Sequence, residues 1–216
     1  MPSTDTSARA RARVGHAIRG LGHAVVGHEI DDERLDRLAA TLEELTREVA
    51  DGAPRSRDTT AFERGDHWLA APGVGEEFDR FFDRPVSGEA SPWGLDPVVR
   101  RTADGVEAVV TLRAAHEGAP ARSHGGIVSA LFDDLFGFLL VVEAVPAFTG
   151  ELTIRYLRGT PLHVPLTCRL RIDSQEGRKL FMTAELTEPG GEVCARAKAT
   201  FITIDTSVVP RWGDGV

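Results

Sequence analysis

A histidine followed by two glycines, at positions 124–126, is the most informative chemical feature of the sequence. Gly125 and Gly126 let the backbone turn sharply into the apolar stretch that follows them. The first amides of a helix have no partner inside the helix and lie at the positive end of its dipole. An amide at this turn can therefore hold an anion, including the oxyanion that forms when a carbonyl is attacked. The same residues also fit a plain tight turn.

Asp133 is the second candidate for chemistry, two helical turns further along. It interrupts the apolar run ALFDDLF, and a carboxylate is costly to bury there unless it is hydrogen-bonded or has a function. Such an aspartate can attack a carbonyl itself or activate a water molecule. The adjacent Asp134 satisfies the same reasoning, and either carboxylate could instead bond a serine or a backbone group. The chemistry of the residues alone does not choose between the two.

One apolar helix and about five strands are expected to position these residues. Residues 127–148 hold the most apolar stretch, which is hydrophobic on nearly every face and therefore predicts a buried helix. Alternating apolar residues predict strands at 106–112, 148–156, 166–172, 180–186 and 193–201. Short turns between the later strands favour antiparallel hairpins. We predict an α+β fold, in which an antiparallel sheet of about five or six strands wraps around one long buried helix.

The chain is predicted to contain four parts: an N-terminal helical extension (1–52), a linker with loops (53–93), the main domain (94–205) and a tail (206–216). Within the extension, apolar residues at three- and four-residue steps form one stripe of a helix: Leu35, Leu38, Leu42, Leu45 and Val49. An earlier stripe predicts another helix, interrupted by Gly20 and Gly22: Val14, Ile18, Leu21 and Val25. We expect this helical pair to pack on its own domain or on a sister subunit.

The composition argues against several classes of partner and cofactor. The net charge of −8 disfavours nucleic acid or an anionic membrane as a partner, since both are bound through basic surface. Cys168 and Cys194 are too few for a disulfide framework, and no histidine or cysteine pattern predicts a metal site. The N-terminus lacks the pattern of a secretory signal, so we expect a cytoplasmic protein.

Three segments taken together resemble one known family. The runs HGGIVSALFDD, FTGELTIRYLRGTPL and EGRKLFMTAEL, in this order, look like those of the hotdog-fold acyl-CoA thioesterases. The branch that they resemble most contains phenylacetyl-CoA thioesterases and the mitochondrial long-chain acyl-CoA thioesterases. The resemblance covers about residues 90–204. It implies a hotdog fold, a homodimer formed edge to edge or a homotetramer of two such dimers, and active sites at the dimer interface.

The resemblance also assigns roles to individual residues. The family's oxyanion-hole glycine matches Gly125. Its catalytic carboxylate, eight residues later, matches Asp133 rather than Asp134. His124 takes the place of a histidine that orients the thioester or the loop, and Thr149 matches a threonine that assists the carboxylate or its water in some relatives.

Further matches concern substrate binding. Gly126 completes the turn beside the oxyanion glycine. Arg158, Arg178 and Lys179 match basic positions that could meet the phosphates of CoA, for which arginine and lysine have suitable geometry and charge. An equally weighted alternative is that all three are ordinary solvent-exposed residues at the ends of strands. Ser91 stands where many relatives carry an asparagine that can line the partner's active site.

We therefore predict a thioester hydrolase of lipid metabolism that converts an acyl-CoA to a free acid and CoA. The Gly125 N–H would polarise the carbonyl, and Asp133 would attack it or activate the water. No metal or redox cofactor is required, and CoA enters as part of the substrate. Two other functions remain open on the same fold. One is a non-catalytic accessory protein that binds acyl-CoA or acyl-carrier protein, and the other is hydration of an enoyl thioester.

Overall fold

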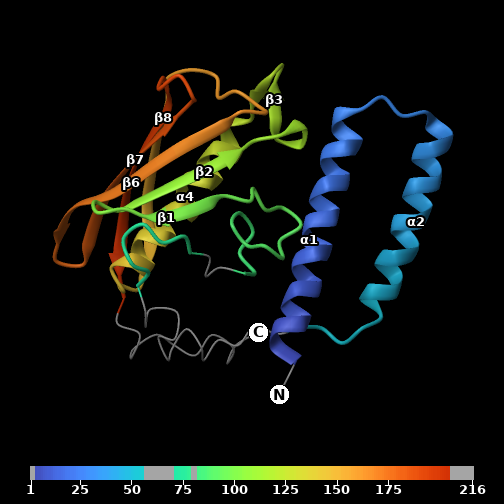
Figure 1. Ribbon diagram of the computed structural model, residues 1–216, viewed down its shortest axis with the longest axis horizontal. Coiled ribbons are helices and arrows are strands. Elements are labelled where there is room, and N and C mark those ends of the chain that lie inside the picture. The colour runs from blue at the N-terminus through green and yellow to red at the C-terminus, as the bar shows by residue number, and fades with distance from the viewer. Residues whose placement is uncertain (1–2, 56–70, 79–81, 205–216) are drawn as a thin grey trace.

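The computed structural model describes residues 3–55, 71–78 and 82–204. Two helices, α1 (Ser3–Gly27) and α2 (Asp32–Ala50), come first and lie side by side next to the rest of the fold (Figure 1). The strands and the long helix α4 (Gly125–Val142) follow from residue 98 onward. Part of the predicted linker and the whole predicted tail lie outside the described residues.

Six antiparallel strands form one sheet in the order β1-β2-β6-β7-β8-β5. In chain order they are β1 (Val98–Arg101), β2 (Val106–Thr111), β5 (Ala147–Tyr156), β6 (Pro165–Glu176), β7 (Lys179–Thr187) and β8 (Val193–Thr203). The alternating sequence explains them, since every second residue of β7 is buried. Gly177 closes the β6–β7 hairpin at a φ of +56°, which glycine adopts without strain. A short 3-10 helix, η1 (Ala114–His116), and a small hairpin of β3 (Glu117–Ala119) and β4 (Arg122–Ser123) precede α4.

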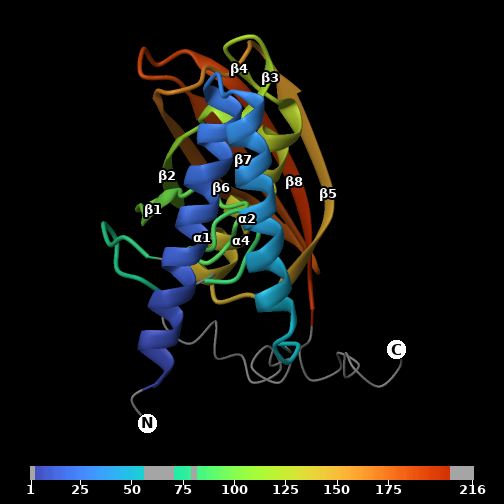
Figure 2. The same cartoon turned by 90° about the vertical axis from the view of Figure 1, so that its right-hand side faces the viewer.

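Helix α4 forms the centre of the core. Eleven of its residues are buried, and the sheet curves around it (Figure 2). By length and composition α4 could cross a membrane, but 67% of it is buried inside the fold, as in the core helix of a globular domain. It ends at Val142, before the predicted end of the apolar stretch, because Ala144 leaves the helical conformation with a φ of +52° and Pro146 follows. The predicted α+β hotdog fold is confirmed.

Helix α1 is fixed to the main domain through one buried arginine. Arg19 is 6% exposed. Its guanidinium donates to the carbonyls of Glu89 and Ser91 and pairs with Asp96, with 2.5 Å between Nη2 and Oδ1. Gly15 lets the helix approach closely, because a Cβ there would lie 2.7 Å from the backbone of Ala90. The prediction that two glycines interrupt this helix is wrong, since α1 is continuous through both and is held to the domain on either side of them.

Strand β5 leaves one long edge of the sheet open. It pairs with β8 on one side, and no described residue pairs with its other side. Most of its residues are exposed, including Phe148 at 45% and Tyr156 at 49%. An open edge of ten residues presents unpaired N–H and C=O groups that can accept another strand.

Candidate active site

The His-Gly-Gly turn forms the N-terminus of α4. His124 is the N-cap residue in extended conformation, and its Nδ1 accepts a hydrogen bond from Gly126 N–H at 3.0 Å. The backbone N–H of His124 donates to the carbonyl of His116 at 2.8 Å. Gly118 of β3 packs against this turn, because a Cβ there would lie 2.6 Å from the His124 Cα. The histidine therefore shapes the helix start and takes up one of its free amides.

Gly125 carries the amide that stays available. Its N–H makes no hydrogen bond to any described residue, whereas its carbonyl accepts two. The donors are Ser129 Oγ at 3.0 Å and Tyr156 Oη at 2.9 Å, and these two hydroxyls lie 2.6 Å apart. The turn is thus held by side chains while one amide at the positive end of the helix remains free.

Ser129 and Tyr156 were missed by the sequence analysis. Two signals were present, since Ser129 lies four residues after Gly125 on the same helix face and Tyr156 is the only tyrosine in the chain. Neither signal says that a strand residue reaches the helix start. That contact depends on how β5 packs along α4.

Asp133 and Thr149 form the predicted carboxylate–hydroxyl pair. Thr149 Oγ1 donates to Asp133 Oδ1 at 2.9 Å. Asp133 lies on α4 and Thr149 near the start of β5, and both are exposed in this chain. The expectation that an apolar environment surrounds Asp133 is therefore not met within one chain, because its side of α4 is open next to the free sheet edge.

Asp134 has the opposite environment. Its side chain is 10% exposed, and Oδ1 lies 3.7 Å from Nη1 of Arg84. Burial raises the pKa of the Asp134 carboxyl, while Ser87 and the Arg84 guanidinium favour its charged form and Asp133 disfavours it. Consecutive helix residues point about 100° apart, so one aspartate faces the loop that holds Arg84 and the other faces the open edge. The arrangement gives Asp134 a structural ion pair.

Gly125 and Asp133 are too far apart to act on one carbonyl within a single chain. Eight residues of α-helix span roughly 12 Å along the axis. An oxyanion donor lies about 3 Å from the carbonyl oxygen, and the attacking atom must contact the same carbonyl carbon. Within one chain the two groups therefore cannot contact the same carbonyl group.

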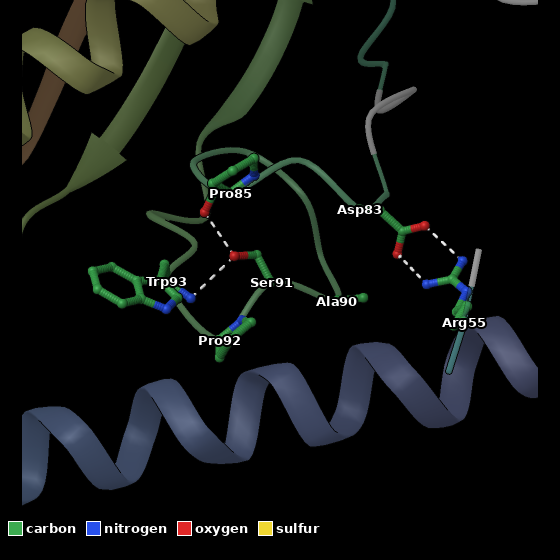
Figure 3. Close-up of a pocket in the computed structure, with 7 residues that line it drawn as sticks. All are labelled: Arg55, Asp83, Pro85, Ala90, Ser91, Pro92 and Trp93. Atoms are coloured by element: carbon green, nitrogen blue, oxygen red, sulfur yellow. Dashed lines mark hydrogen bonds and ion pairs between the residues drawn. The ribbon is translucent and has the colours of Figure 1, made fainter. Parts of the chain in front are cut away.

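Ser91 is fully engaged within its own loop (Figure 3). Its hydroxyl donates to the carbonyl of Pro85 at 2.7 Å and accepts from the N–H of Trp93 at 3.0 Å. The residue lines a hollow of about 400 Å³, across which Arg55 and Asp83 form an ion pair with 2.7 Å between Nη2 and Oδ2. Among the described residues, no hydrogen bond or ion pair joins Ser91 to the His-Gly-Gly turn or to the carboxylate pair.

The predicted phosphate-binding residues are split between two ends of the sheet. Arg158 follows β5 and pairs with Glu188, at 3.1 Å, and with Glu192. These carboxylates raise the pKa of the Arg158 guanidinium and already offset its charge. Lys179 lies opposite Ile202 at the far end of β8.

Arg178 lies beside Lys179, and its Nε donates to the carbonyl of Thr203 at 3.0 Å. Both residues are exposed, at the end of the sheet where β5 begins. The structure therefore does not bring Arg158 together with Arg178 and Lys179 in one chain. Within the described residues, no group of three or more His, Cys, Asp or Glu could hold a metal ion.

Comparison with known proteins supports the fold. The model of the thioesterase superfamily matches residues 123–195, a range that contains the His-Gly-Gly turn, Asp133 and Thr149. This segment of the chain is similar to the thioesterase superfamily, and it lies within a hotdog fold.

Two proteins are similar to a larger part of the chain. The chain is 27% identical over 131 residues to acyl-coenzyme A thioesterase THEM4 of Mus musculus, a match that spans 60% of this chain and 54% of the relative. It thus covers about half the length of that curated protein. The crystal structure of protein RHA08564, a thioesterase superfamily protein, is 27% identical with a TM-score of 0.73. That similarity covers 89% of this chain and 90% of the other, so it extends beyond the hotdog domain.

Proposed function

We propose that this protein hydrolyses the thioester bond of an acyl-CoA, with Asp133 and the Gly125 N–H as the acting groups. The observation that carries the proposal is the Asp133–Thr149 pair, an exposed carboxylate on the core helix beside an open sheet edge. The likeness to a protein named as an acyl-coenzyme A thioesterase supports the substrate class.

The proposed reaction uses the free amide and the carboxylate on opposite sides of the carbonyl. The Gly125 N–H stabilises the negative charge that develops on the thioester oxygen. Asp133 either removes a proton from water or attacks the carbonyl carbon itself, and Thr149 holds one of its oxygens. If Asp133 removes a proton from water, the water oxygen forms the new C–O bond, the C–S bond breaks, and the departing thiolate takes up that proton. If Asp133 attacks, its own oxygen forms the C–O bond of a mixed anhydride as the C–S bond breaks. Water then hydrolyses the anhydride to the acid and free Asp133, and supplies the proton that the thiolate takes up. This reaction needs no metal or redox cofactor.

Each proposed site combines two chains, because of the roughly 12 Å between the two groups along one helix. A second copy can add its own β5 antiparallel to the open edge, which gives the isologous contact of a two-fold dimer. Asp133 of one copy then faces the free amide of Gly125 of the other. The same contact would cover the exposed side of Asp133 and exclude water around the carboxylate.

The first experiment measures free-thiol release from short-chain, long-chain and aryl acyl-CoAs. We expect Asp133→Asn to lose hydrolysis while it keeps its melting temperature, because asparagine has nearly the same shape and its amide oxygen can still accept from Thr149 Oγ1. Asp134→Asn is the matched control at the adjacent position, and it should alter stability more than turnover. Binding of acyl-CoA with no thiol release by the unmodified protein would favour the accessory-protein alternative.

Gly125→Pro tests the amide separately. Gly125 is the first residue of α4, where proline fits the helix and removes only the N–H. His124, with a ψ of 134°, already has the backbone that precedes a proline. Removal of one oxyanion donor costs about 100- to 1000-fold in kcat.

Mixing the two inactive variants tests whether the sites are shared. After joint refolding, a mixed dimer of Asp133→Asn and Gly125→Pro would contain one site with both groups intact. We expect activity to return to about a quarter of the unmodified level, since about half of the dimers are mixed and each has one working site. Sites built within single chains would show no recovery.

Single turnover in ¹⁸O-labelled water distinguishes the two roles of Asp133. A nucleophilic carboxylate acquires label in the protein, whereas a general base leaves the label only in the acid product.

A further inference from the structure

Helix α2 carries an apolar stripe that the described part of the chain leaves unburied. Its five members, here called the α2 seam, are spaced at alternating steps of three and four residues: Leu35, Leu38, Leu42, Leu45 and Val49. The structure describes the whole of α2, and none of its residues is buried. The exposed fraction is 50% for Leu45 and 79% for Val49. This spacing is that of a heptad repeat, in which the apolar positions face another helix.

Helix α1 carries a matching stripe on a side that its anchor to the main domain does not use. Val14, Ile18 and Val25 are exposed at 59%, 48% and 38%, and Leu21 completes the stripe. The anchoring residues Gly15 and Arg19 lie on a different face of the helix. Figures 1 and 2 show α1 and α2 as an antiparallel pair standing beside the domain.

An antiparallel pair of helices with a heptad stripe on each is half of a four-helix bundle. Most helices in proteins owe their stability to the packing of an apolar face rather than to propensity. A 19-residue helix with no buried residue therefore lacks the usual source of stability among the residues that the structure describes. Exposed apolar stripes of this kind mark contact surfaces.

We propose that a second copy of this chain covers the α2 seam and the α1 stripe, so that two α1–α2 hairpins pack into an antiparallel four-helix bundle. The interface would be isologous, with the same seam contributed by both copies. This contact is separate from the β5 edge and does not depend on the activity proposed for Asp133.

The charges of α2 favour a second α2 helix as its partner over a membrane surface. The helix contains six acidic and three basic residues, whereas helices that lie on membranes carry lysine and arginine on the polar face. When two α2 helices are aligned antiparallel with Leu42 of one on Leu38 of the other, Arg34 of each flanks the same layer as Glu48 of the other. Opposite charges at these flanking positions set partner choice and orientation. Thr41, next to the centre of this alignment, then lies close to its own counterpart.

The test is crosslinking of the full chain through single cysteines at adjacent positions of α2. Thr41→Cys flanks the seam, whereas Ala40→Cys lies on the opposite side of the helix and serves as the matched control. Both positions are exposed, so both variants should fold, and the native Cys168 and Cys194 are buried. With a bismaleimide of short spacer, we expect the Thr41→Cys protein to form covalent dimers at least fivefold faster than the control.

A charge exchange then tests the alignment itself. Arg34→Glu and Glu48→Arg, each introduced into the Thr41→Cys protein, should slow crosslinking, and the two together should restore it. Helix content from circular dichroism shows that each variant is folded. Equal crosslinking at Thr41 and Ala40, or none at either, overturns the proposal and leaves a different protein or α1 itself as the cover. Crosslinking that the charge exchange does not affect overturns the antiparallel alignment.

Discussion

His116 joins α1 to the His-Gly-Gly turn, and we expect it to make the fold sensitive to acid. His116 is 7% exposed, and burial lowers its pKa from 6.5 to about 4, with further lowering by the charges of His23 and Arg113. Asp96 opposes this effect. The Nδ1 of His116 accepts from Arg113 N–H at 3.0 Å, so a proton on this nitrogen would break the bond. Its ring meets that of His23 edge to face, with 4.7 Å between centroids.

The sign of the pH dependence follows from the two pKa values of His116. Between pH 6.5 and about 4 the unfolded chain binds a proton at this histidine and the folded chain does not. The contribution to stability is therefore complete above pH 6.5 and is lost as the pH falls toward 4. The full pKa difference corresponds to about 3 kcal/mol, which solvent screening at the open side of the ring reduces to about 2 kcal/mol.

His116→Asn separates this effect from general acid unfolding. An asparagine oxygen can replace Nδ1 as the acceptor for Arg113 N–H but does not titrate. We expect the variant to be about 1 kcal/mol less stable at pH 7. On going to pH 4.5, however, it should lose about 2 kcal/mol less than the unmodified protein. Urea denaturation of both proteins at the two pH values gives the difference, from which all other titrating groups largely cancel. Parallel loss of stability in the two proteins would refute the reasoning.

Three further substitutions test the packing around the site. Tyr156→Phe removes the donor to the carbonyl of Gly125, and we expect hydrolysis to fall about five- to tenfold, as loss of about 1 kcal/mol implies, with little change in melting temperature. Gly118→Ala forces a methyl group against His124, so both activity and stability should fall, the latter by about 1–3 kcal/mol in thermal melts. Because burial raises the pKa of Asp134, the unmodified protein should lose stability relative to Asp134→Asn as the pH rises above the ordinary aspartate range. Denaturation at pH 4 and pH 8 measures that change, and a constant difference would contradict it.

The sequence predicted those parts of the structure that depend on local pattern. The alternation in β7 and β8 and the apolar character of α4 directly reflect which side of each element is buried. The His-Gly-Gly turn was recognisable because a sharp turn before an apolar helix requires these residue types. The pairing of Thr149 with Asp133 came from the family resemblance, and the structure places the two in contact.

Contacts between distant segments could not be predicted in this way. Asp133 and Asp134 are chemically identical, and their different environments depend on Arg84, some fifty residues earlier in the chain. His116 showed no partner pattern, because its partner His23 lies on a helix that the sequence treats as an extension. The basic residues proposed for CoA were placed by family position alone, and that position does not report that Glu188 and Glu192 already pair with Arg158.

The buried Arg19 makes the N-terminal helix part of the structure of the main domain. Its guanidinium satisfies two carbonyls in the loop of Glu89 and Ser91 and one carboxylate just before β1. A chain trimmed to the sheet and its core helix would leave these acceptors without their donor. Arg19 and Asp96, more than seventy residues apart, therefore depend on each other for this contact. Truncation at the predicted boundary near residue 52 would remove the donor of all three contacts at once.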